Sequence, residues 1–292
     1  MAPPLMWVAI EPRSLTDQAA LLAALAKLTT EDPSLLVADA EDSEHVILGG
    51  MSEQHLDLKI DALKHTCNVD FKIGALQVAY RERITKKVTV EYTHKKQTRG
   101  AGQFAKTKIA VEPIERGAGF QFENETIGGA LPSEYIPSIE KGAKSALCAG
   151  ILAGFPVVDI KVALIDGTYH EIDSSALAFE IAARMAVREA LMNGECVLLE
   201  PIMVIEVLAP PECSCVLIDD LKRRRGTIWG EKKRDREVAI AASVPLATML
   251  GYDSNIRSMS LGRATFAMRF ERYDDVPFPD PPPFRPAIGM RA

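Results

Sequence analysis

One order of strands and helices occurs twice in this chain and limits the possible folds more than any other feature. Alternating and apolar runs predict the order strand, helix, strand, strand, helix, strand over residues 1–78, and the same order returns over residues 199–275. A βαββαβ order over about this length is typical of the ferredoxin-like split βαβ sandwich. The sequence therefore predicts two small α+β domains with a third region between them.

The first copy, residues 1–78, contains two amphipathic helix patterns. Ser14, with Asp17 three positions later, resembles a capping box that begins a helix running to about residue 29. A second helix is predicted over about residues 52–65. The residues expected to face the core are Leu21, Leu22, Leu25 and Leu28 in the first helix and Leu56, Ile60 and Leu63 in the second. Strands are predicted over residues 5–11, 35–38, 45–48 and 69–73.

The second copy, residues 199–275, is followed by a proline-rich tail. We expect strands over residues 202–208, 227–230, 238–244 and 263–270, and helices over about residues 212–224 and 245–250. Beyond the last strand, six of the 18 prolines fall within ten residues. This composition predicts an extended or disordered tail over residues 276–292.

Between the two copies, residues 79–198 are expected to form an α/β domain built around a long hairpin. Strand patterns on both sides of residues 94–106 predict a hairpin over residues 78–111. Gly100 and Gly102 permit the positive φ angles that a tight reversal requires.

The rest of this middle domain is predicted to bring a second loop to the end of the hairpin. A short strand over residues 120–122, a helix over 137–147 and an apolar strand over 156–165 are followed by a loop at 166–173. That loop leads into a helix beginning near Ser174 or Ser175, whose inner side is predicted to carry Leu177, Ile181, Met185 and Val187. The loops around residues 98 and 169 are expected at one end of the domain.

Positive charge is concentrated in two segments of a chain whose net charge is -6. Residues 85–108 contain seven Lys or Arg and one acid, and residues 222–236 contain eight and two, so each segment carries +6 and the remainder -18. A cationic hairpin on an acidic body fits contact with a phosphate backbone in a defined orientation. The alternative is a solvated turn whose lysines aid solubility, and the hairpin alone does not decide between them.

The composition, 47% hydrophobic and 25% charged, indicates a soluble globular protein of two or three domains. The first residues lack the pattern of a secretory signal, and no apolar run reaches membrane-spanning length. Five scattered cysteines without a Cys-x-x-Cys pair favour a reducing, cytoplasmic location. Neither the cysteines nor His55 and His65 show zinc-site spacing, so we predict no metal site. Since no apolar run is long enough to span a membrane, we also predict no membrane partner.

Eleven short signatures spread over the three predicted domains carry a family resemblance. They are VAIEP at 8–12, GMSEQHL at 50–56, QVAYRE at 77–82, HKKQT at 94–98, GAGQF at 100–104, EYIP at 134–137, GFPVVD at 154–159, YHEIDSS at 169–175, LEPIM at 199–203, RRRG at 223–226, and the set PL, MLGY and GRA between 245 and 264. In this order they resemble the C-terminal half, domains III to V, of bacterial elongation factor G or a paralogue like it.

The resemblance implies a fold and an inventory of domains. Residues 1–78, 79–198 and 199–275 would be domains III, IV and V, with two ferredoxin-like sandwiches flanking a domain like ribosomal protein S5 domain 2. The sequence has no Gly-Lys dipeptide and no Asn-Lys-x-Asp pattern, so no nucleotide-binding loop is expected. We therefore predict that this chain is not an enzyme and has no cofactor, since GTP and Mg²⁺ would belong to an absent G domain.

The resemblance also implies a ribosome-binding role in tRNA–mRNA translocation during translation elongation. Carried over by position, the residues that contact the decoding region would be Lys95, Lys96, Gln97, Thr98, Arg99, Gly100, Gly102, Gln103, Tyr169 and His170. Large-subunit rRNA would be contacted by Arg223, Arg224 and Arg225. The expected partners are the ribosome, with its rRNA, tRNA–mRNA and stalk-base proteins, and a G-domain half if the chain is a fragment; the chain itself is expected to be a monomer.

Departures from the family pattern keep a second function open. Cys215 and Asp219 stand where glycines are usual, Ser52 and Gln54 depart from a Gly-Glu-Leu-His-Leu pattern, and Arg99 replaces the first of two tip glycines. The alternative is a truncated or divergent paralogue that occupies the ribosome as a regulator or decoy.

Two alternatives concern individual sites. The three arginines at 223–225 could instead complement the dipole at a helix end. A hydrolase site around Tyr169 and His170 is disfavoured, because no nucleophile-elbow pattern accompanies these residues.

Overall fold

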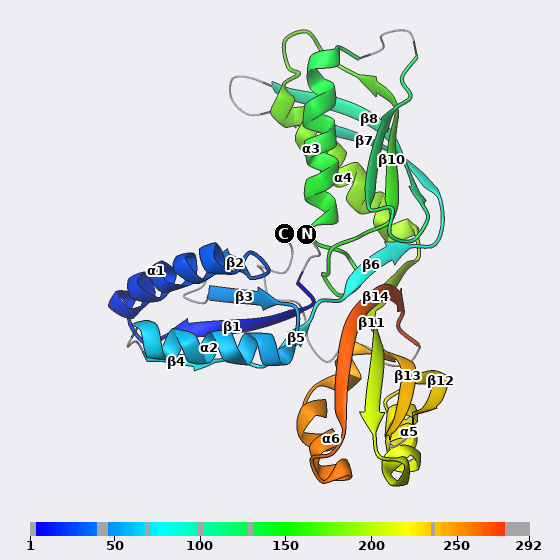
Figure 1. Cartoon of the computed structure of the whole chain (residues 1–292). Helices are drawn as coiled ribbons and strands as arrows, with labels where there is room; N and C mark the ends of the chain where they lie inside the picture. The colour runs from blue at the N-terminus through cyan, green and yellow to red at the C-terminus, as the bar shows by residue number, and fades with distance from the viewer. Residues whose placement is uncertain are drawn as a thin grey trace. The chain divides into compact units, whose positions relative to one another are not determined.

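The computed structural model describes residues 4–39, 46–67, 70–97, 102–127, 131–234 and 237–277 (Figure 1). The chain divides into two compact units: the first contains Met1–Ala79 and Glu200–Asp274, and the second contains Tyr80–Leu199 and the segment that starts at Asp275. Residues 1–79 and 200–274 each form a sheet of their own. If the four main strands of each sheet are counted in chain order, both sheets have the order 2-3-1-4.

The N-terminal sheet has the order β2-β3-β1-β4, with β5 also pairing with β1 (Figure 1). This order, with antiparallel pairing throughout, is the ferredoxin-like arrangement that the sequence predicts. The strands are β1 (Met6–Pro12), β2 (Leu36–Asp39), β3 (Val46–Gly50), β4 (Phe71–Ile73) and β5 (Gln77–Val78), and the helices are α1 (Leu15–Glu31) and α2 (Glu53–Cys67).

The core-facing stripes of these two helices are nearly as predicted. Ser14 caps α1, since its Oγ accepts from Asp17 N at 3.2 Å. Leu21 and Leu25 are buried, as are all three predicted residues of α2. Leu22 is 37% exposed, so the prediction that it faces the core was wrong. Ala24 and Leu28 are half-buried at the edge of the α1 stripe, whereas Leu22 lies on the exposed side of the helix.

The second ferredoxin-like sheet has the order β12-β13-β11-β14. Its strands are β11 (Cys196–Ala209), β12 (Thr227–Arg234), β13 (Glu237–Pro245) and β14 (Thr265–Asp275). Its helices are α5 (Ser214–Arg223), preceded by the 3-10 turn η2 (Pro211–Cys213), and α6 (Tyr252–Ser260), preceded by η3 (Leu246–Met249).

The second helix of this domain lies later than the sequence indicated. Residues 245–250, predicted to be helical, form the short turn η3, and the α-helix begins only after Gly251. Gly251 adopts φ 68°, a left-handed conformation that glycine reaches without strain, and it separates the two segments. The helix α6 was missed because few of its residues are apolar: Tyr252 and Ile256 carry its buried side.

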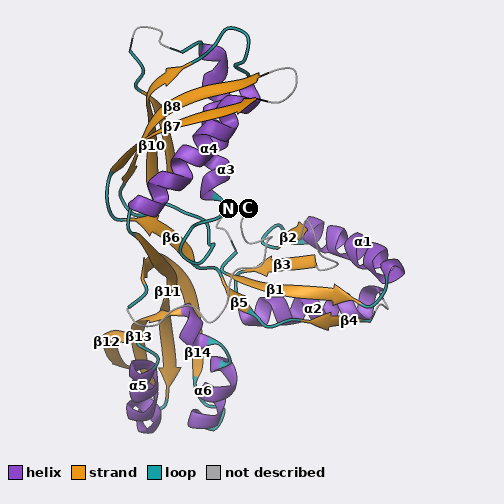
Figure 2. Cartoon of the chain, turned by 180° about the vertical axis from the view of Figure 1, so that it is seen from behind, coloured by secondary structure: helices purple, strands orange, loops and turns teal. Residues whose placement is uncertain are grey.

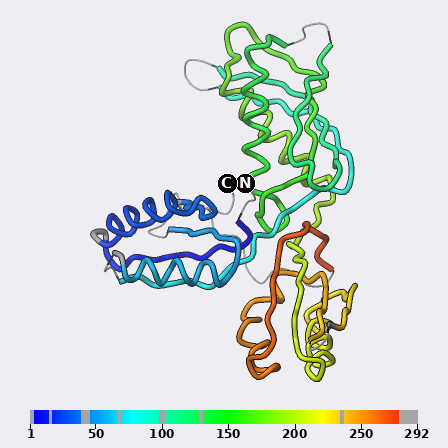
Figure 3. The backbone as a smooth tube through the Cα atoms, in the orientation of Figure 1, coloured from blue at the N-terminus to red at the C-terminus, as the bar shows by residue number. Residues whose placement is uncertain are grey.

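The second unit contains a four-stranded sheet in the order β7-β8-β10-β9, in which β10 and β9 run parallel. Figure 2 labels the strands β7, β8 and β10 of this sheet. Its strands are β7 (Val88–Gln97), β8 (Gly102–Pro113), β9 (Phe120–Asn124) and β10 (Ile160–Thr168), and its helices are α3 (Ile136–Leu147), preceded by the turn η1 (Ser133–Tyr135), and α4 (Ala176–Asn193). Figure 3 follows the chain through this unit from cyan to green.

The hairpin of this unit is shorter than predicted. Strand β6 (Arg81–Ile84) does not belong to it and pairs instead with Cys196–Leu199 of β11. The hairpin itself consists of β7 and β8, which pair from Val88↔Val111 to Gln97↔Gly102. Local strand patterns do not reveal which partner a strand takes, so a non-local pairing of this kind escapes a sequence reading.

The inner side of α4 also differs from the prediction. Leu177 and Met185 are 54% and 39% exposed, Ile181 is half-buried, and only Val187 of the predicted set is fully buried. The buried face is rich in alanine instead: Ala178, Phe179, Ala182, Ala183, Ala186, Val187, Ala190 and Leu191. Small residues allow close approach of α3, where a Cβ added at Gly142 would lie 2.2 Å from the Glu180 carbonyl oxygen.

A buried carboxylate organises the loop between α3 and β10. Glu82 is 0% exposed, and its Oε1 accepts from the backbone N–H groups of Ala153, Gly154 and Phe155 at 2.8, 2.8 and 3.0 Å. Its Oε2 accepts from Leu152 N at 2.9 Å. Four converging N–H donors satisfy a charge that would otherwise be costly to bury.

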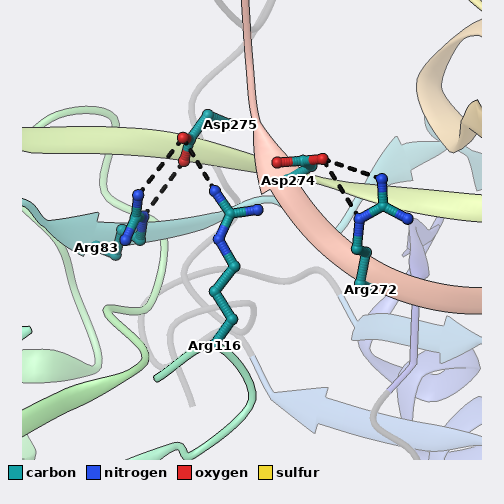
Figure 4. A network of polar contacts seen from close by, with 5 residues as sticks. All are labelled: Arg83, Arg116, Arg272, Asp274 and Asp275. Atoms are coloured by element: carbon teal, nitrogen blue, oxygen red, sulfur yellow. Dashed lines mark hydrogen bonds and ion pairs between the residues drawn. The ribbon is translucent and has the colours of Figure 1, made fainter. Parts of the chain in front are cut away.

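Ion pairs involving arginine lie at the end of β14 (Figure 4). In the second unit, the Asp275 carboxylate forms ion pairs with Arg83 and Arg116. Arg83 Nε lies 3.2 Å from Asp275 Oδ1, and Arg116 Nη2 lies 3.0 Å from Oδ2. In the first unit, Arg272 Nη2 donates to Asp274 at 3.2 Å.

Over the described residues, none of the helices is both long and apolar enough to span a membrane.

Candidate nucleic-acid interface

The predicted basic tip lies at the end of the β7–β8 hairpin. Lys95, Lys96 and Gln97 are exposed and stand opposite Phe104, Gln103 and Gly102. His94 Nε2 lies 3.1 Å from Gln103 Oε1, so a hydrogen bond joins the two strands just before the tip. Thr98, Arg99 and Gly100 of the predicted site lie outside the described residues.

The lysines of the hairpin are not equivalent. Lys106 pairs with Glu91 at 2.6 Å, Lys87 with Glu112 at 2.7 Å, and Lys86 with Glu195. Within the part of the chain that the structure describes, neither Lys95 nor Lys96 forms an ion pair. Lys108 likewise forms no ion pair with a described residue, but it is half-buried. The exposed hairpin lysines without a described acidic partner are therefore Lys95 and Lys96, at its end.

The second loop was predicted over residues 166–173, but strand β10 continues to Thr168. Residues 169–174, which we call loop 2, lie against this hairpin. Phe104 N donates to Asp173 O at 2.9 Å, and Ser174 Oγ donates to Phe104 O at 2.7 Å. The approach is so close that a Cβ added at Gly102 would lie 2.8 Å from the Asp173 carboxylate. The structure thus brings Gly102, Gln103 and His170 into one end of the domain, as the sequence predicted.

His170 is held by backbone groups of its own loop. Its Nδ1 accepts from Ile172 N and Asp173 N, each at 3.3 Å, and its own N–H donates to Ser174 Oγ at 2.9 Å. The imidazole is 56% exposed. Tyr169, also in the predicted site, is 41% exposed. Both side chains are accessible to a partner.

Ser174 and Asp173 are tip residues that the sequence reading left outside the site. Ser175 caps α4 by accepting from Ala178 N, which frees the preceding Ser174 for its contacts with the hairpin. Two adjacent serines before a helix were the available signal, but sequence alone does not tell which one caps and which one points elsewhere.

The three arginines at the end of α5 separate into two groups. Arg225 Nη1 and Nη2 donate to both oxygens of Glu200 at 2.9 and 2.8 Å, and that carboxylate is only 2% exposed. Arg224 pairs with Asp220 at 2.8 Å and lies 5.0 Å from the ring centroid of Tyr252. Arg223 is exposed. Contact with RNA stays a prediction for this cluster, and Arg223 is its most accessible member.

The described residues contain no group of three or more His, Cys, Asp or Glu side chains arranged to hold a metal ion. Cys213 is buried while Cys215 is exposed, and burial raises the pKa of Cys196 to about 12. Such a thiol stays protonated and is a poor nucleophile or metal ligand. The Cys67 side chain lies outside the described part.

Most of the residues that depart from the family pattern fit the fold without strain. Ser52 precedes α2 and its Oγ accepts from His55 N at 3.2 Å, so a serine in place of glycine adds a helix cap. Gln54, Cys215 and Asp219 are exposed on their helices. Arg99 lies outside the described residues.

Three family models match the chain in order: elongation factor G domain III over residues 1–75, domain IV over 76–195, and the elongation factor G C-terminus over 197–280. An elongation factor G from Rhodopseudomonas palustris (strain BisB18) is 56% identical over 274 residues, which are 94% of this chain and 40% of that protein. A crystal structure of a protein from Thermus thermophilus has a TM-score of 0.76 at 37% identity, covering 95% of this chain and 42% of that one. The chain thus spans less than half the length of the curated relative that it matches.

Proposed function

Since this chain belongs to the elongation factor G family and carries its domains III and IV and its C-terminus, we propose that it binds the ribosome and supports tRNA–mRNA translocation through RNA contacts at the domain IV tip. This role does not include GTP hydrolysis. We expect these three domains to hydrolyse no nucleotide and to bind neither a nucleotide nor a metal ion. A ribosome-binding role predicts a cytoplasmic protein.

One observation carries the proposal: Lys95 and Lys96 are exposed at the end of a two-stranded hairpin and form no ion pair with any described residue. An unpaired ammonium group can replace the counterions of a phosphate backbone without first breaking an internal contact. The net charge of the whole chain is -6, so the surrounding protein repels RNA and favours approach by the tip.

Arg223 supports a second contact from the C-terminal domain. It is exposed, whereas the guanidinium groups of Arg224 and Arg225 form ion pairs with Asp220 and Glu200, respectively. We propose that Arg223 makes the contact with large-subunit rRNA and that its two neighbours hold the end of α5 in shape.

The test is binding of the chain to 70S ribosomes over a series of salt concentrations. Replacing Lys95 and Lys96 by alanine is expected to lower the slope of log affinity against log salt by about one per lysine. The matched control is Lys86→Ala with Lys87→Ala, which removes the same charge from residues that already have acidic partners. Equal effects of the two double variants, or binding that does not weaken with salt, would contradict the proposal.

Translocation itself requires a second assay. The chain is joined to the GTPase portion of a competent elongation factor G, and movement of tRNA and mRNA is followed in single-turnover experiments. Activity that falls on Lys95→Ala/Lys96→Ala supports the proposed role. Ribosome binding without any translocation by the fusion would favour the alternative of a regulatory or decoy protein.

A further inference from the structure

One hydroxyl group ties loop 2 to the hairpin. Ser174 Oγ donates to Phe104 O at 2.7 Å and accepts from His170 N at 2.9 Å. Since Phe104 belongs to β8, this atom connects the hairpin directly with the backbone of His170. The bond from Phe104 N to Asp173 O, at 2.9 Å, closes the link from the other side.

The same loop defines which nitrogen of His170 carries the proton. Nδ1 accepts from two backbone N–H groups, those of Ile172 and Asp173, at 3.3 Å each. A ring nitrogen that accepts a hydrogen bond has no proton, so the proton of the neutral ring lies on Nε2. The Asp173 carboxylate is 3.5 Å from Nδ1, but a proton there would face the two backbone N–H groups.

The surface of loop 2 is unlike that of the hairpin. Its charged residues are Glu171 and Asp173, with no Lys or Arg, so it does not favour phosphate. Ile172 is 86% exposed, so its apolar side chain is accessible to a partner. An imidazole N–H donor in the same loop as an exposed apolar side chain is suited to the edge of a base or a ribose.

We propose that Ser174 is a positioning residue, which holds loop 2 so that His170 offers its Nε2–H to a nucleoside of RNA, with the exposed Ile172 of the same loop as a second contact. The identity of the partner rests on the proposed function, whereas the role of Ser174 rests on the hydrogen bonds of this chain alone. The tip then has two parts: the hairpin supplies charge, and loop 2 supplies contacts that do not depend on salt.

The first experiment examines the tip without any partner. In the full chain labelled with ¹⁵N-histidine, NMR is expected to show His170 protonated at Nε2 and unprotonated at Nδ1, with His170→Gln used to assign its signal among five histidines. Ser174→Ala is expected to speed amide exchange at His170 about tenfold, because the acceptor of that N–H is removed. Ser174→Thr keeps the hydroxyl and should restore protection.

The matched control is Ser145→Ala, at an exposed position on α3. It should leave both the His170 signal and amide exchange in loop 2 unchanged. A proton on Nδ1 of wild-type His170, or unchanged exchange at His170 in Ser174→Ala, would overturn the positioning role even if the chain binds ribosomes normally.

The second experiment measures ribosome affinity in the same salt series. Ser174→Ala and Ile172→Ser are each expected to weaken binding about tenfold at every salt concentration, with the slope unchanged. An altered slope, or an affinity equal to that of Ser145→Ala, would overturn the nucleoside contact. A wild-type chain that fails to bind would overturn the proposed function and this contact together, while the NMR result still decides the role of Ser174.

Discussion

Glu82 offers the sharpest test of the physical account of the second unit. Its carboxylate is fully buried and accepts four backbone N–H groups from the loop at residues 152–155. In Glu82→Gln the side chain keeps its size, but one oxygen becomes an NH₂ group. The least costly orientation places NH₂ at the Oε2 position, facing Leu152 N–H, and keeps the three bonds to the other oxygen.

The magnitude follows from this geometry. Hydrogen bonds to a charged group contribute about 1.5–3 kcal/mol and neutral ones about 0.5–1.5, so weakening three bonds loses roughly 3 kcal/mol. Leu152 N–H loses its acceptor, which costs about 1–3 kcal/mol more, and the relief from burying a charge offsets part of the sum. We expect a net loss of about 3 kcal/mol, which corresponds to about 10 °C in the unfolding temperature of this unit.

The assay is hydrogen exchange measured by NMR, because a chain with two compact units has no single free energy of unfolding. Amides at Ala182 and Ala186, in the buried face of α4, report unfolding of the whole unit, and the amide of Gly154 reports local opening. The control is Glu189→Gln at an exposed position of α4. A change below about 0.5 kcal/mol at all three amides would refute the reasoning, since surface substitutions fall in that range.

Three further predictions concern the first unit. The pKa of Asp32 is well below its ordinary value because its carboxylate accepts hydrogen bonds from Lys59, Ser34 and His55, so its contribution to stability is present above about pH 4 and is lost as pH falls below it. Asp32→Asn should remove that part of the acid unfolding curve followed by circular dichroism and cost about 1 kcal/mol at pH 7. An unchanged curve would contradict this prediction. Arg225→Ala leaves Glu200, only 2% exposed, without its bidentate partner and should cost about 3–5 kcal/mol in thermal unfolding. Arg223→Ala should leave unfolding unchanged and weaken ribosome binding instead, so the reverse pattern would show that the roles of these two arginines are misassigned.

The order of elements in both ferredoxin-like domains was predictable because it rests on local periodicity. In α1 and α2 the leucines and isoleucines recur at helical spacing, and most of them are buried as expected. The helix α6 escaped prediction because it is short and few of its residues are apolar, and packing holds it in place, with Tyr252 against Phe266 at 5.1 Å between ring centroids. Tertiary contacts, rather than local preference, determine such a segment.

The middle domain shows a different limit. Sequence periodicity assigns large apolar residues to the core, yet α4 buries mainly alanines because α3 approaches it closely at Gly142. The larger Leu177 and Met185 are left partly exposed. A small-residue face is recognisable only when its partner helix is known, so this core was not accessible from one sequence.

The candidate site reveals why clustered charge is an incomplete guide to an interface. The hairpin and the end of α5 have equal net charge in the sequence, but the fold gives their cations different partners. Arg224 and Arg225 are engaged by Asp220 and a nearly buried Glu200, whereas Lys95 and Lys96 form no ion pair with any described carboxylate. A cation already paired at short range gains little from a phosphate, because one ion pair must break before another forms. Charge that remains unpaired after folding is therefore the better guide to where the proposed RNA contact of this chain should be tested.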